Sequence, residues 1–400
     1  MWYNRMRGVL GLRLQLYLHF PFCKRKCQYC DFCSAAPRPG EMEAYADELV
    51  AEIRREGAVW PGAEVTTVFL GGGTPSLFPA PLMARVLAAL REAFAILPNA
   101  EMTSEANPGV LTADWLDVLR VQGFCRLSLG MQARQERLLA LLGRVHRWSD
   151  VEQAVAMARR AGFASLNLDV MTGLPTQTAA EVTETLQAAA ALGAEHLSIY
   201  SLIVEDGTPL KDKLARGEWT LPDEDTLAAI DAAVAAETAR NGYERYEISN
   251  YAKQGYECRH NLGYWQGEWY LGLGVAAHSL LPPEQGEQWR RCRNTESLDE
   301  YLRQTRQGES PRVEMQRISP REAMFETMML GLRTVQGVSG PTFAARFGQT
   351  LDERYGAALS RLEREGLLYR TLDGGAALTA RGLDVENDVA LRFMDDFDLL

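Results

Sequence analysis

Residues 14–30 read LQLYLHFPFCKRKCQYC, a short apolar run followed by three closely spaced cysteines. The run Leu14–Phe20 predicts a buried β-strand, and Cys23, Cys27 and Cys30 follow it with the spacing C-x3-C-x2-C. Three thiolates in one loop suit three corners of a cubane iron–sulfur cluster and leave the fourth iron free. A free iron can bind and activate a ligand, as catalytic metal ions do through their open position.

Zinc is the alternative occupant of such a loop. Zinc usually takes four ligands from two paired motifs, and no second C-x2-C or histidine pair follows here, so the spacing favours the cluster. Lys24, Arg25 and Lys26 lie between the first two cysteines. Their charge is expected to lower the pKa values of the thiols and to offset the negative charge of the cluster.

Beyond this loop, strand-like and helix-like segments alternate up to about residue 201. Strands joined through helices pair in parallel with right-handed crossovers, and six such units curl into an open barrel. We therefore predict an α/β fold with a partial (βα)6 TIM-like barrel. The expected strands are Leu14–Phe20, Val65–Leu70, Glu101–Glu105, Arg126–Leu129, Ser165–Val170 and His196–Tyr200. The expected helices are Met42–Arg55, Pro81–Phe94, Thr112–Val121, Asp150–Arg160 and Ala179–Leu192.

Polar or glycine-rich features follow the carboxyl end of every expected strand, which is where βα barrels carry their chemistry. A random placement would scatter such features along the chain, so their coincidence predicts one shared site. In chain order they are the cysteines, Gly71 to Pro75, Glu105, Gln132, Asp169 and Tyr200.

The remaining half of the chain has a looser pattern. A helix is expected near Asp223–Arg240, followed by an aromatic-rich stretch to residue 270 and a Pro/Gln/Glu-rich loop at 282–288. From 316 onward, helices near 321–333, 341–347 and 352–365 precede a hairpin around residues 373–375, which predicts a mostly helical, winged-helix-like domain. We expect three parts, namely 1–215, 216–315 and 316–400.

Composition limits the classes of function. The net charge of −11 provides no basic stripe for a phosphate backbone, so nucleic acid is not expected as a partner, and the last domain is expected to serve structure or docking. Charged and polar residues interrupt the apolar run at the start of the chain, and no segment reaches the roughly 18 apolar residues of a membrane span. Seven cysteines, four of them within residues 23–33, indicate a ligand cluster in a reducing, cytoplasmic setting.

The C-x3-C-x2-C spacing with Tyr29 before the last cysteine resembles the signature of the radical S-adenosylmethionine (SAM) superfamily. In that family a [4Fe–4S] cluster binds the amine and carboxylate of SAM, and reduction cleaves SAM to a 5′-deoxyadenosyl radical. The resemblance covers residues 14–210 and implies an electron donor for the cluster. Gly71-Gly72-Gly73 is similar to the glycine-rich loop that contacts the methionine amine of SAM.

The coproporphyrinogen oxidase-like branch of this family is the closer resemblance, on Gly72-Gly-Thr-Pro75, Glu105-Ala-Asn-Pro108, Arg126-Leu-Ser-Leu-Gly130-Met-Gln132, Gly143-Arg-Val-His146 and Asp169-Val-Met-Thr-Gly-Leu-Pro175. By this likeness Arg144 is expected to pair with the carboxylate of SAM, and Asp169 or Glu105 to accept from its ribose hydroxyls. The residues implied to surround SAM are Tyr17, Gly72, Gly73, Thr74, Glu105, Gln132, Arg144 and Asp169.

Within the branch, two functions compete. Oxygen-independent coproporphyrinogen III oxidases, which decarboxylate propionate side chains, carry a fourth cysteine where this chain has Phe32, whereas an aromatic residue there resembles the HemW-like heme chaperones. Cys33, one residue later, departs from both and is expected to be a bystander thiol. The short segment before Tyr17 also favours the chaperones, because the oxidases carry a longer extension that helps to close the substrate site.

The stretch His260-Asn-Leu-Gly-Tyr-Trp265 resembles the H-N-x-x-Y-W motif of those chaperones. His260 is the candidate heme ligand, with Tyr264, Trp265 and Trp269 as candidates to cover a porphyrin face, and a histidine hydrogen-bonded in the core is the alternative. The resemblance thus implies a protein that binds [4Fe–4S], SAM and heme and passes heme to heme-dependent proteins. Coproporphyrinogen III decarboxylation is the enzymatic alternative, and modification of a macromolecule such as RNA is disfavoured by the acidic charge. The oligomeric state stays open.

Overall fold

The computed structural model describes residues 11–283 and 288–394. The first ten residues of the N-terminal segment and residues 284–287 of the Pro/Gln/Glu-rich loop lie outside this part. The six expected strands are present as β1 (Arg13–Phe20), β2 (Glu64–Gly72), β3 (Ala95–Ala106), β4 (Arg126–Gln132), β5 (Ser165–Thr172) and β6 (His196–Ser201). They pair in parallel in sequence order, which confirms the predicted α/β fold of radical SAM type.

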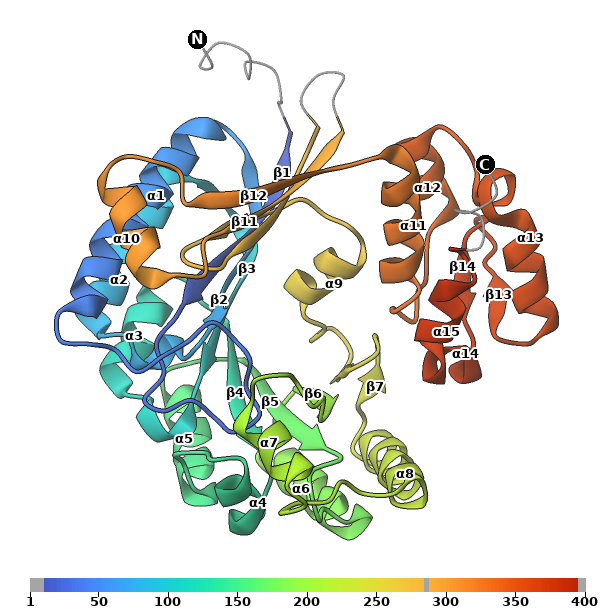
Figure 1. The fold of residues 1–400 in the computed structure, drawn as a ribbon, viewed down its shortest axis with the longest axis horizontal. Coiled ribbons are helices and arrows are strands. Elements are labelled where there is room, and N and C mark those ends of the chain that lie inside the picture. The colour runs from blue at the N-terminus through green and yellow to red at the C-terminus, as the bar shows by residue number, and fades with distance from the viewer. Residues whose placement is uncertain (1–10, 284–287, 395–400) are drawn as a thin grey trace.

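The helices between these strands cover the outer face of the curved sheet (Figure 1). They are α1 (Glu41–Val59), α2 (Ala80–Ala93), α3 (Ala113–Val121), α4 (Glu136–Leu141), α5 (Trp148–Arg160) and α6 (Ala179–Ala191). All were expected except α4, which has six residues and is too short to show a helical period. β3 begins six residues earlier than predicted, because Ala95 and Ile96 already pair with β2.

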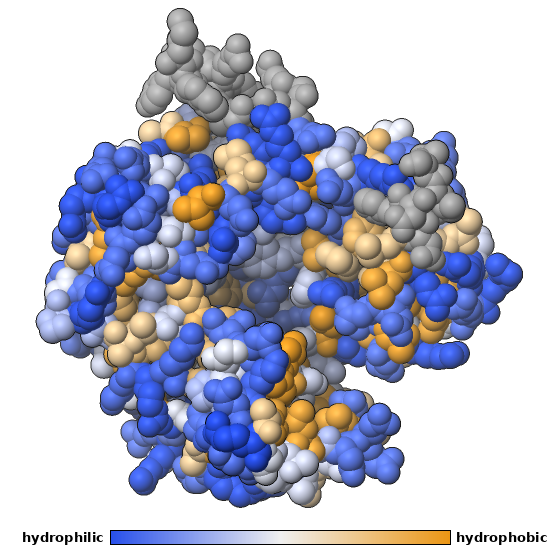
Figure 2. Space-filling model, viewed as in Figure 1, coloured by the Kyte–Doolittle hydropathy of each residue, from blue (hydrophilic) through white to orange (hydrophobic). Residues whose placement is uncertain are grey.

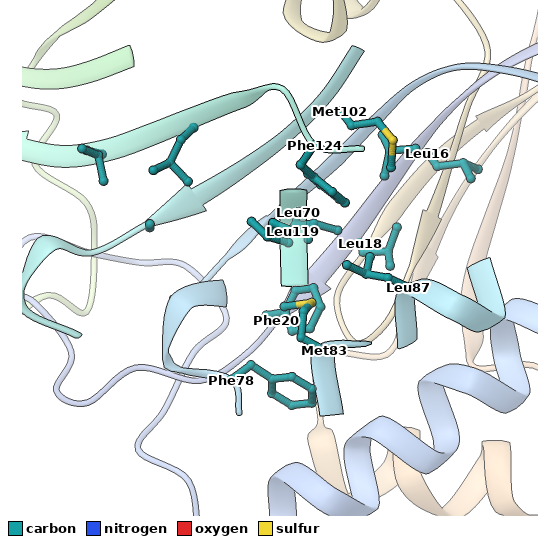
Figure 3. Packing of buried hydrophobic residues seen from close by; sticks show 14 of the residues in the cluster. Leu16, Leu18, Phe20, Leu70, Phe78, Met83, Leu87, Met102, Leu119 and Phe124 are labelled. Atoms are coloured by element: carbon teal, nitrogen blue, oxygen red, sulfur yellow. The ribbon is translucent and has the colours of Figure 1, made fainter. Parts of the chain in front are cut away.

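Apolar and polar side chains alternate along the strands and therefore point to opposite faces of the sheet. Leu14, Leu16, Leu18 and Phe20 of β1 are fully buried against the helices, and Gln15 between them faces the other side. Figure 3 shows the result, with Leu16, Leu18 and Leu70 from the strands packed against Met83 and Leu87 of α2 and Leu119 of α3. The inner face carries the polar residues of each strand, so the sheet places its chemistry inside the curve.

The sheet continues beyond the parallel strands at both edges, with the order β12-β11-β10-β9-β1-β2-β3-β4-β5-β6-β8-β7. At one edge, β9 (Tyr270–Leu273) pairs in parallel with β1 and is followed by the antiparallel strands β10 (His278–Leu281), β11 (Trp289–Asn294) and β12 (Arg312–Ile318). At the other edge, β8 (Asn250–Ala252) and β7 (Glu244–Arg245) are antiparallel. In the described residues the sheet is open, since β12 and β7 end it.

Four helices accompany these additions. α7 (Pro209–Ala215), α8 (Glu224–Arg240) and α10 (Leu298–Arg306) lie outside the sheet, whereas α9 (Arg259–Trp265) lies on its concave side (Figure 1). Gly263 lets α9 approach β1, because a Cβ at this position would overlap the Gln15 amide. The α9 helix therefore partly closes the open side of the curved sheet.

The C-terminal part has a separate hydrophobic core. It contains α11 (Pro320–Gly331), α12 (Gly340–Phe347), α13 (Leu351–Arg364) and the hairpin β13 (Leu368–Arg370) with β14 (Ala376–Leu378). This order of helices and hairpin is the predicted one, and α14 (Ala380–Asp384) and α15 (Glu386–Leu391) were not expected. No helix among the described residues is long and apolar enough to cross a bilayer.

Candidate functional site

The three cysteines of the motif lie in the loop that follows β1. The loop is pinned at its base, because Cys23 N donates to Ala35 O at 3.0 Å and Ala35 N donates to Pro21 O at 2.9 Å. Cys23, Cys27 and Cys30 all line one recess at the carboxyl ends of the strands. The cysteines are therefore brought together as predicted from their spacing.

Side chains from other parts of the fold reach the cysteines that border the recess. No group of three His, Cys, Asp or Glu side chains in the described ranges is drawn around one point as a single metal ion requires. Cys23 Sγ lies 3.3 Å from Thr74 Oγ1, and Cys27 Sγ accepts from Arg144 Nη1 at 3.5 Å. Polar groups of the neighbouring strand ends thus already contact the sulfur atoms.

The basic residues of the loop do not dominate the acidity of Cys30. Burial raises the pKa of its thiol to about 11, and the opposing effects of the Phe32 backbone and of Lys26 are smaller. Lys26 thus lowers the pKa of Cys30 as expected, but burial outweighs this effect in the metal-free protein. Cys33 does not line the recess, and its thiol donates to Glu296 O at 3.2 Å.

The glycine-rich loop after β2 forms one wall of the recess. Gly72 has φ +104°, and a Cβ there would lie 2.5 Å from the His19 ring. Gly73 N and Thr74 N donate to the carbonyls of Phe20 and Phe22, each at 2.8 Å. Side chains at these glycines would block the close approach of the two loops.

Glu105 and Asp169 face the same recess from the ends of β3 and β5. Burial, together with the charge of Asp169, raises the pKa of Glu105 to about 8, although Gly72 N–H opposes this shift. Burial raises the pKa of Asp169 to about 6, against hydrogen bonds from Asn167 Nδ2 at 2.7 Å and Ser128 Oγ at 3.3 Å. Near pH 7, Glu105 holds a proton and Asp169 is mostly ionised.

Gln132 and Arg144 complete this end of the site. Gln132 has φ +69°, a left-handed conformation that is uncommon for a residue with a side chain and that often marks functional sites. Arg144 Nη2 donates to Gly130 O at 2.8 Å, and its buried Nε has no hydrogen-bond partner among the described residues. An unpaired donor of a buried guanidinium fits a recess that receives an anionic group.

An interior cavity of about 450 Å³ continues from the recess along the concave face of the sheet. Glu105, Gln132 and Asp169 line both spaces, and Tyr17 lines the interior one. Figure 2 shows the molecule hollowed between the sheet and the C-terminal helices. This volume lies within the range of roughly 300–1,000 Å³ that is usual for small-molecule sites.

Sequence reasoning missed the inward-facing residues at the middle and start of the strands. They follow the period of two that separates the sheet's faces, so the alternation itself could have found them. They are Thr103, Arg126, Ser128, Asn167, His196 and Ser198, all of which line the interior cavity.

His260 lies on α9 and lines the interior cavity. Its Nδ1 lies 2.6 Å from Thr67 Oγ1 and its Nε2 lies 3.0 Å from Tyr264 Oη, while Phe69 stacks on its ring. Burial lowers the pKa of His260 to about 3, so the imidazole is neutral. Both ring nitrogens of His260 have a hydrogen-bond partner, so an iron atom would have to displace Thr67 or Tyr264.

The aromatic residues of this region do not gather on one face. Tyr264 lines the interior cavity, whereas Trp265 lines a cleft towards α11 and α12. Trp269 packs edge-to-face on Trp289, with ring centroids 4.9 Å apart. The expectation that Tyr264, Trp265 and Trp269 together cover a porphyrin is therefore not met in this conformation.

Two family models match the chain. The model of the radical SAM superfamily matches residues 17–189, and the model of the HemN C-terminal domain matches residues 318–385. The fold also matches the solved structure of coproporphyrinogen III oxidase (HemN) from Escherichia coli with a TM-score of 0.82 and 23% sequence identity, over 98% of this chain and 92% of that one. The fold is thus that of a radical SAM protein, a class that implies a [4Fe–4S] cluster and SAM.

Relatives in sequence show to which family within the radical SAM superfamily the chain belongs. The heme chaperone HemW of Bacillus subtilis is 32% identical over 95% of this chain and 99% of its own length. The heme chaperone HemW of Escherichia coli is 39% identical over 67% of this chain and 70% of its own, and a mitochondrial radical SAM domain-containing protein 1 of Bos taurus is 33% identical over 89% and 82%. The chain belongs to the HemW family within the radical SAM superfamily.

Proposed function

We propose that this chain is a heme chaperone, which binds heme and delivers it to heme-dependent proteins. The observation that carries the proposal is the identity of 32–39% to several relatives named heme chaperone, which in Bacillus subtilis extends over nearly the whole of both chains. Phe32 at the position of the oxidases' fourth cysteine supports the same choice. Coproporphyrinogen III decarboxylation is less favoured, since the likeness to the solved oxidase at 23% identity concerns the fold alone.

The residues around the recess have roles in this proposal. Cys23, Cys27 and Cys30 would hold a [4Fe–4S] cluster, which supplies an open iron and an electron for bound SAM. Arg144 would pair with the carboxylate of SAM, and the backbone of Gly72 and Gly73 would approach its amine. Thr74, beside Cys23 Sγ, would border the cluster.

The inner ends of the recess would take the nucleoside of SAM. Asp169, held by Asn167 and Ser128, would accept from ribose hydroxyls, and protonated Glu105 can donate as well as accept. Gln132, which lines the recess and the interior cavity, and Tyr17, which lines the interior cavity, would orient the bound molecule. The three-part division at 215 and 315 and the cytoplasmic location remain predictions from the sequence.

His260 is the proposed heme ligand. Its neutral imidazole is competent to ligate iron, provided that the hydrogen bond to Thr67 or to Tyr264 opens. The recipients of heme would be heme-dependent proteins, and an electron donor would reduce the cluster.

Anaerobic reconstitution of the cluster allows a direct test. Hemin is titrated into wild type and His260→Ala while the Soret band is followed, and a parallel sample receives SAM, a reductant and coproporphyrinogen III. Heme uptake and transfer to an apo-heme protein without porphyrinogen turnover is the expected result. Decarboxylation of coproporphyrinogen III would refute the chaperone assignment. An unchanged heme spectrum in His260→Ala would exclude His260 as the heme ligand but would leave the chaperone assignment intact.

A further inference from the structure

The end of the interior cavity opposite the cluster loop carries a buried cation. Arg126 is the first residue of β4, lines the cavity and is 3% exposed. Its Nη1 donates to Ser165 Oγ at 3.0 Å and to Tyr256 O at 2.9 Å. Within residues 11–283 and 288–394, no carboxylate forms an ion pair with Arg126, and the hydrogen bonds of its guanidinium group are the two made by Nη1.

Glu101, which lines a surface cleft together with Arg126, is engaged elsewhere. Glu101 caps the start of α9, where its two oxygens accept from His260 N at 3.1 Å and from Arg259 N at 3.2 Å. His196 is neutral, because burial and the charge of Arg126 lower its pKa well below the usual value. Among the described residues Arg126 thus has hydrogen bonds but no ion-pair partner, and burying an unpaired charge is costly.

A second unsatisfied group lies beside this cation. Thr103 and Arg126 are register partners on the parallel strands β3 and β4, so their side chains share the inner face. Thr103 is fully buried and lines the same cavity, and its Oγ1 has no hydrogen-bond partner in the part of the chain that the structure describes. Free N–H groups of a guanidinium next to a free hydroxyl form a set of donors that suits a carboxylate.

We propose that Arg126 and Thr103 bind a carboxylate at this end of the cavity, and that the carboxylate is a propionate group of heme. The choice of heme as its source rests on the proposed function. Heme carries two propionates, and His260 lines the same cavity, so one ligand would engage both. A free organic acid would present the same chemical group, and the two sources are separable by experiment.

The test compares hemin with hemin dimethyl ester, in which both propionates are masked. Each is titrated anaerobically into the full chain with a reconstituted cluster, as wild type, Arg126→Gln, Thr103→Val and Arg259→Gln. Arg259 is the matched control, because it lines the surface cleft on the other side of Arg126 but not the interior cavity. Thr103→Val keeps the shape of the side chain but removes its hydroxyl group. This variant still tests the carboxylate site if Arg126→Gln fails to fold.

Wild type is expected to bind hemin at least about tenfold more tightly than the diester, as one charge-assisted contact implies. Arg126→Gln and Thr103→Val should weaken hemin binding and leave diester binding unchanged, and Arg259→Gln should change neither. Equal affinities of wild type for hemin and diester, or equal losses in Arg126→Gln and Arg259→Gln, would overturn the proposal.

A separate measurement applies if wild type binds no heme, in which case the proposed function has failed. Sodium propionate, compared with sodium chloride at equal concentration, should then raise the Tm of wild type and leave that of Thr103→Val or Arg126→Gln unchanged. This result would retain the carboxylate site without heme. An unchanged Tm of wild type would refute the site itself.

Discussion

At the scale of single residues, the recess beside the three cysteines depends on conformations and protonation states that few residue types allow. Gly72 combines a positive φ with a contact to the His19 ring, and Gln132 adopts the left-handed region despite its side chain. Glu105 retains a proton at neutral pH because the protein buries it near Asp169. These features occur at the ends of neighbouring strands, where the predicted SAM residues meet.

Gly72→Ala should destabilise the protein more than an alanine at another glycine of positive φ. Gly207 is the control, since its φ is +73° and a Cβ there would meet nothing within 4 Å, whereas at Gly72 it would meet His19. We expect about 1 kcal/mol from the backbone at both positions. Overpacking should add about 1–3 kcal/mol at Gly72 alone, measured by urea unfolding of the metal-free protein. Equal losses of unfolding free energy in the two variants would show that the His19 ring moves aside without destabilising the protein.

Glu105→Gln should change how stability depends on pH. The pKa of Glu105 is about 8 in the folded protein and near 4.5 when unfolded, so the folded state binds more protons between these values. Its contribution to stability is fully present below pH 4.5 and is lost as the pH rises to 8, with a slope of at most about 1.4 kcal/mol per unit.

The glutamine variant should therefore lose less stability than wild type between pH 6 and pH 8. Urea unfolding of metal-free protein at both values measures the difference. Parallel pH dependences of the two proteins would contradict the raised pKa.

At the scale of secondary-structure elements, α9 explains why the H-N-x-x-Y-W motif has its composition. His260 and Tyr264 contact each other and the inner face of the sheet, and Gly263 admits the Gln15 side chain. Glu101 of β3 caps the helix. The motif thus builds a short helix that fits against the open side of the sheet, in addition to any role in binding heme.

Gly263→Ala should destabilise the protein by about 1–3 kcal/mol, because the added methyl group overlaps Gln15, which is 1% exposed. Combining Gly263→Ala with Gln15→Ala should recover part of this loss, since the shortened side chain leaves room. A double-mutant cycle on the free energy of unfolding measures the coupling, which should be at least about 0.5 kcal/mol. Additive losses would show that α9 moves away from β1 instead.

At the scale of the whole molecule, two hydrophobic cores meet through a small apolar cluster. The first core lies between the sheet and its outer helices, and the second lies within the C-terminal helices. The buried residues of this cluster are Leu280, Ile318 and Ala323. Trp289 packs against them, and its ring contacts the rings of Trp269 and Phe347. The ion pair of Arg291 with Glu326, at 2.7 Å, bridges the same boundary.

Trp289→Ala should uncouple the two cores. Loss of its two aromatic contacts should cost about 1–3 kcal/mol, because the ring is only partly buried. We expect calorimetry to resolve a separate, lower transition for the C-terminal helices in the variant. Trp289→Phe, which keeps an aromatic ring, is the control and should unfold nearly as wild type. A single transition in both variants would show that other contacts suffice to couple the cores.

The sequence alone determined the parallel core and the loop that carries the three closely spaced cysteines. Apolar periodicity defines strands and helices locally, parallel pairing brings all the strand ends to one edge, and the spacing of Cys23, Cys27 and Cys30 puts three thiols into one loop. Each of these inferences depends on residues that are close together in the chain or on a rule of topology. They needed no knowledge of long-range contacts.

Only the tertiary structure decided what the distant segments do. It placed β9 beside β1, inserted α9 into the concave side of the sheet and gave His260 its two partners. In the ranges that the structure describes, it also left Arg126 without an ion pair to a carboxylate. Such outcomes depend on which side chains meet across more than a hundred residues, and on how far burial shifts their pKa values. Neither the long-range contacts nor the size of the pKa shifts is encoded in the local pattern of a strand or helix, so neither could be predicted from that pattern.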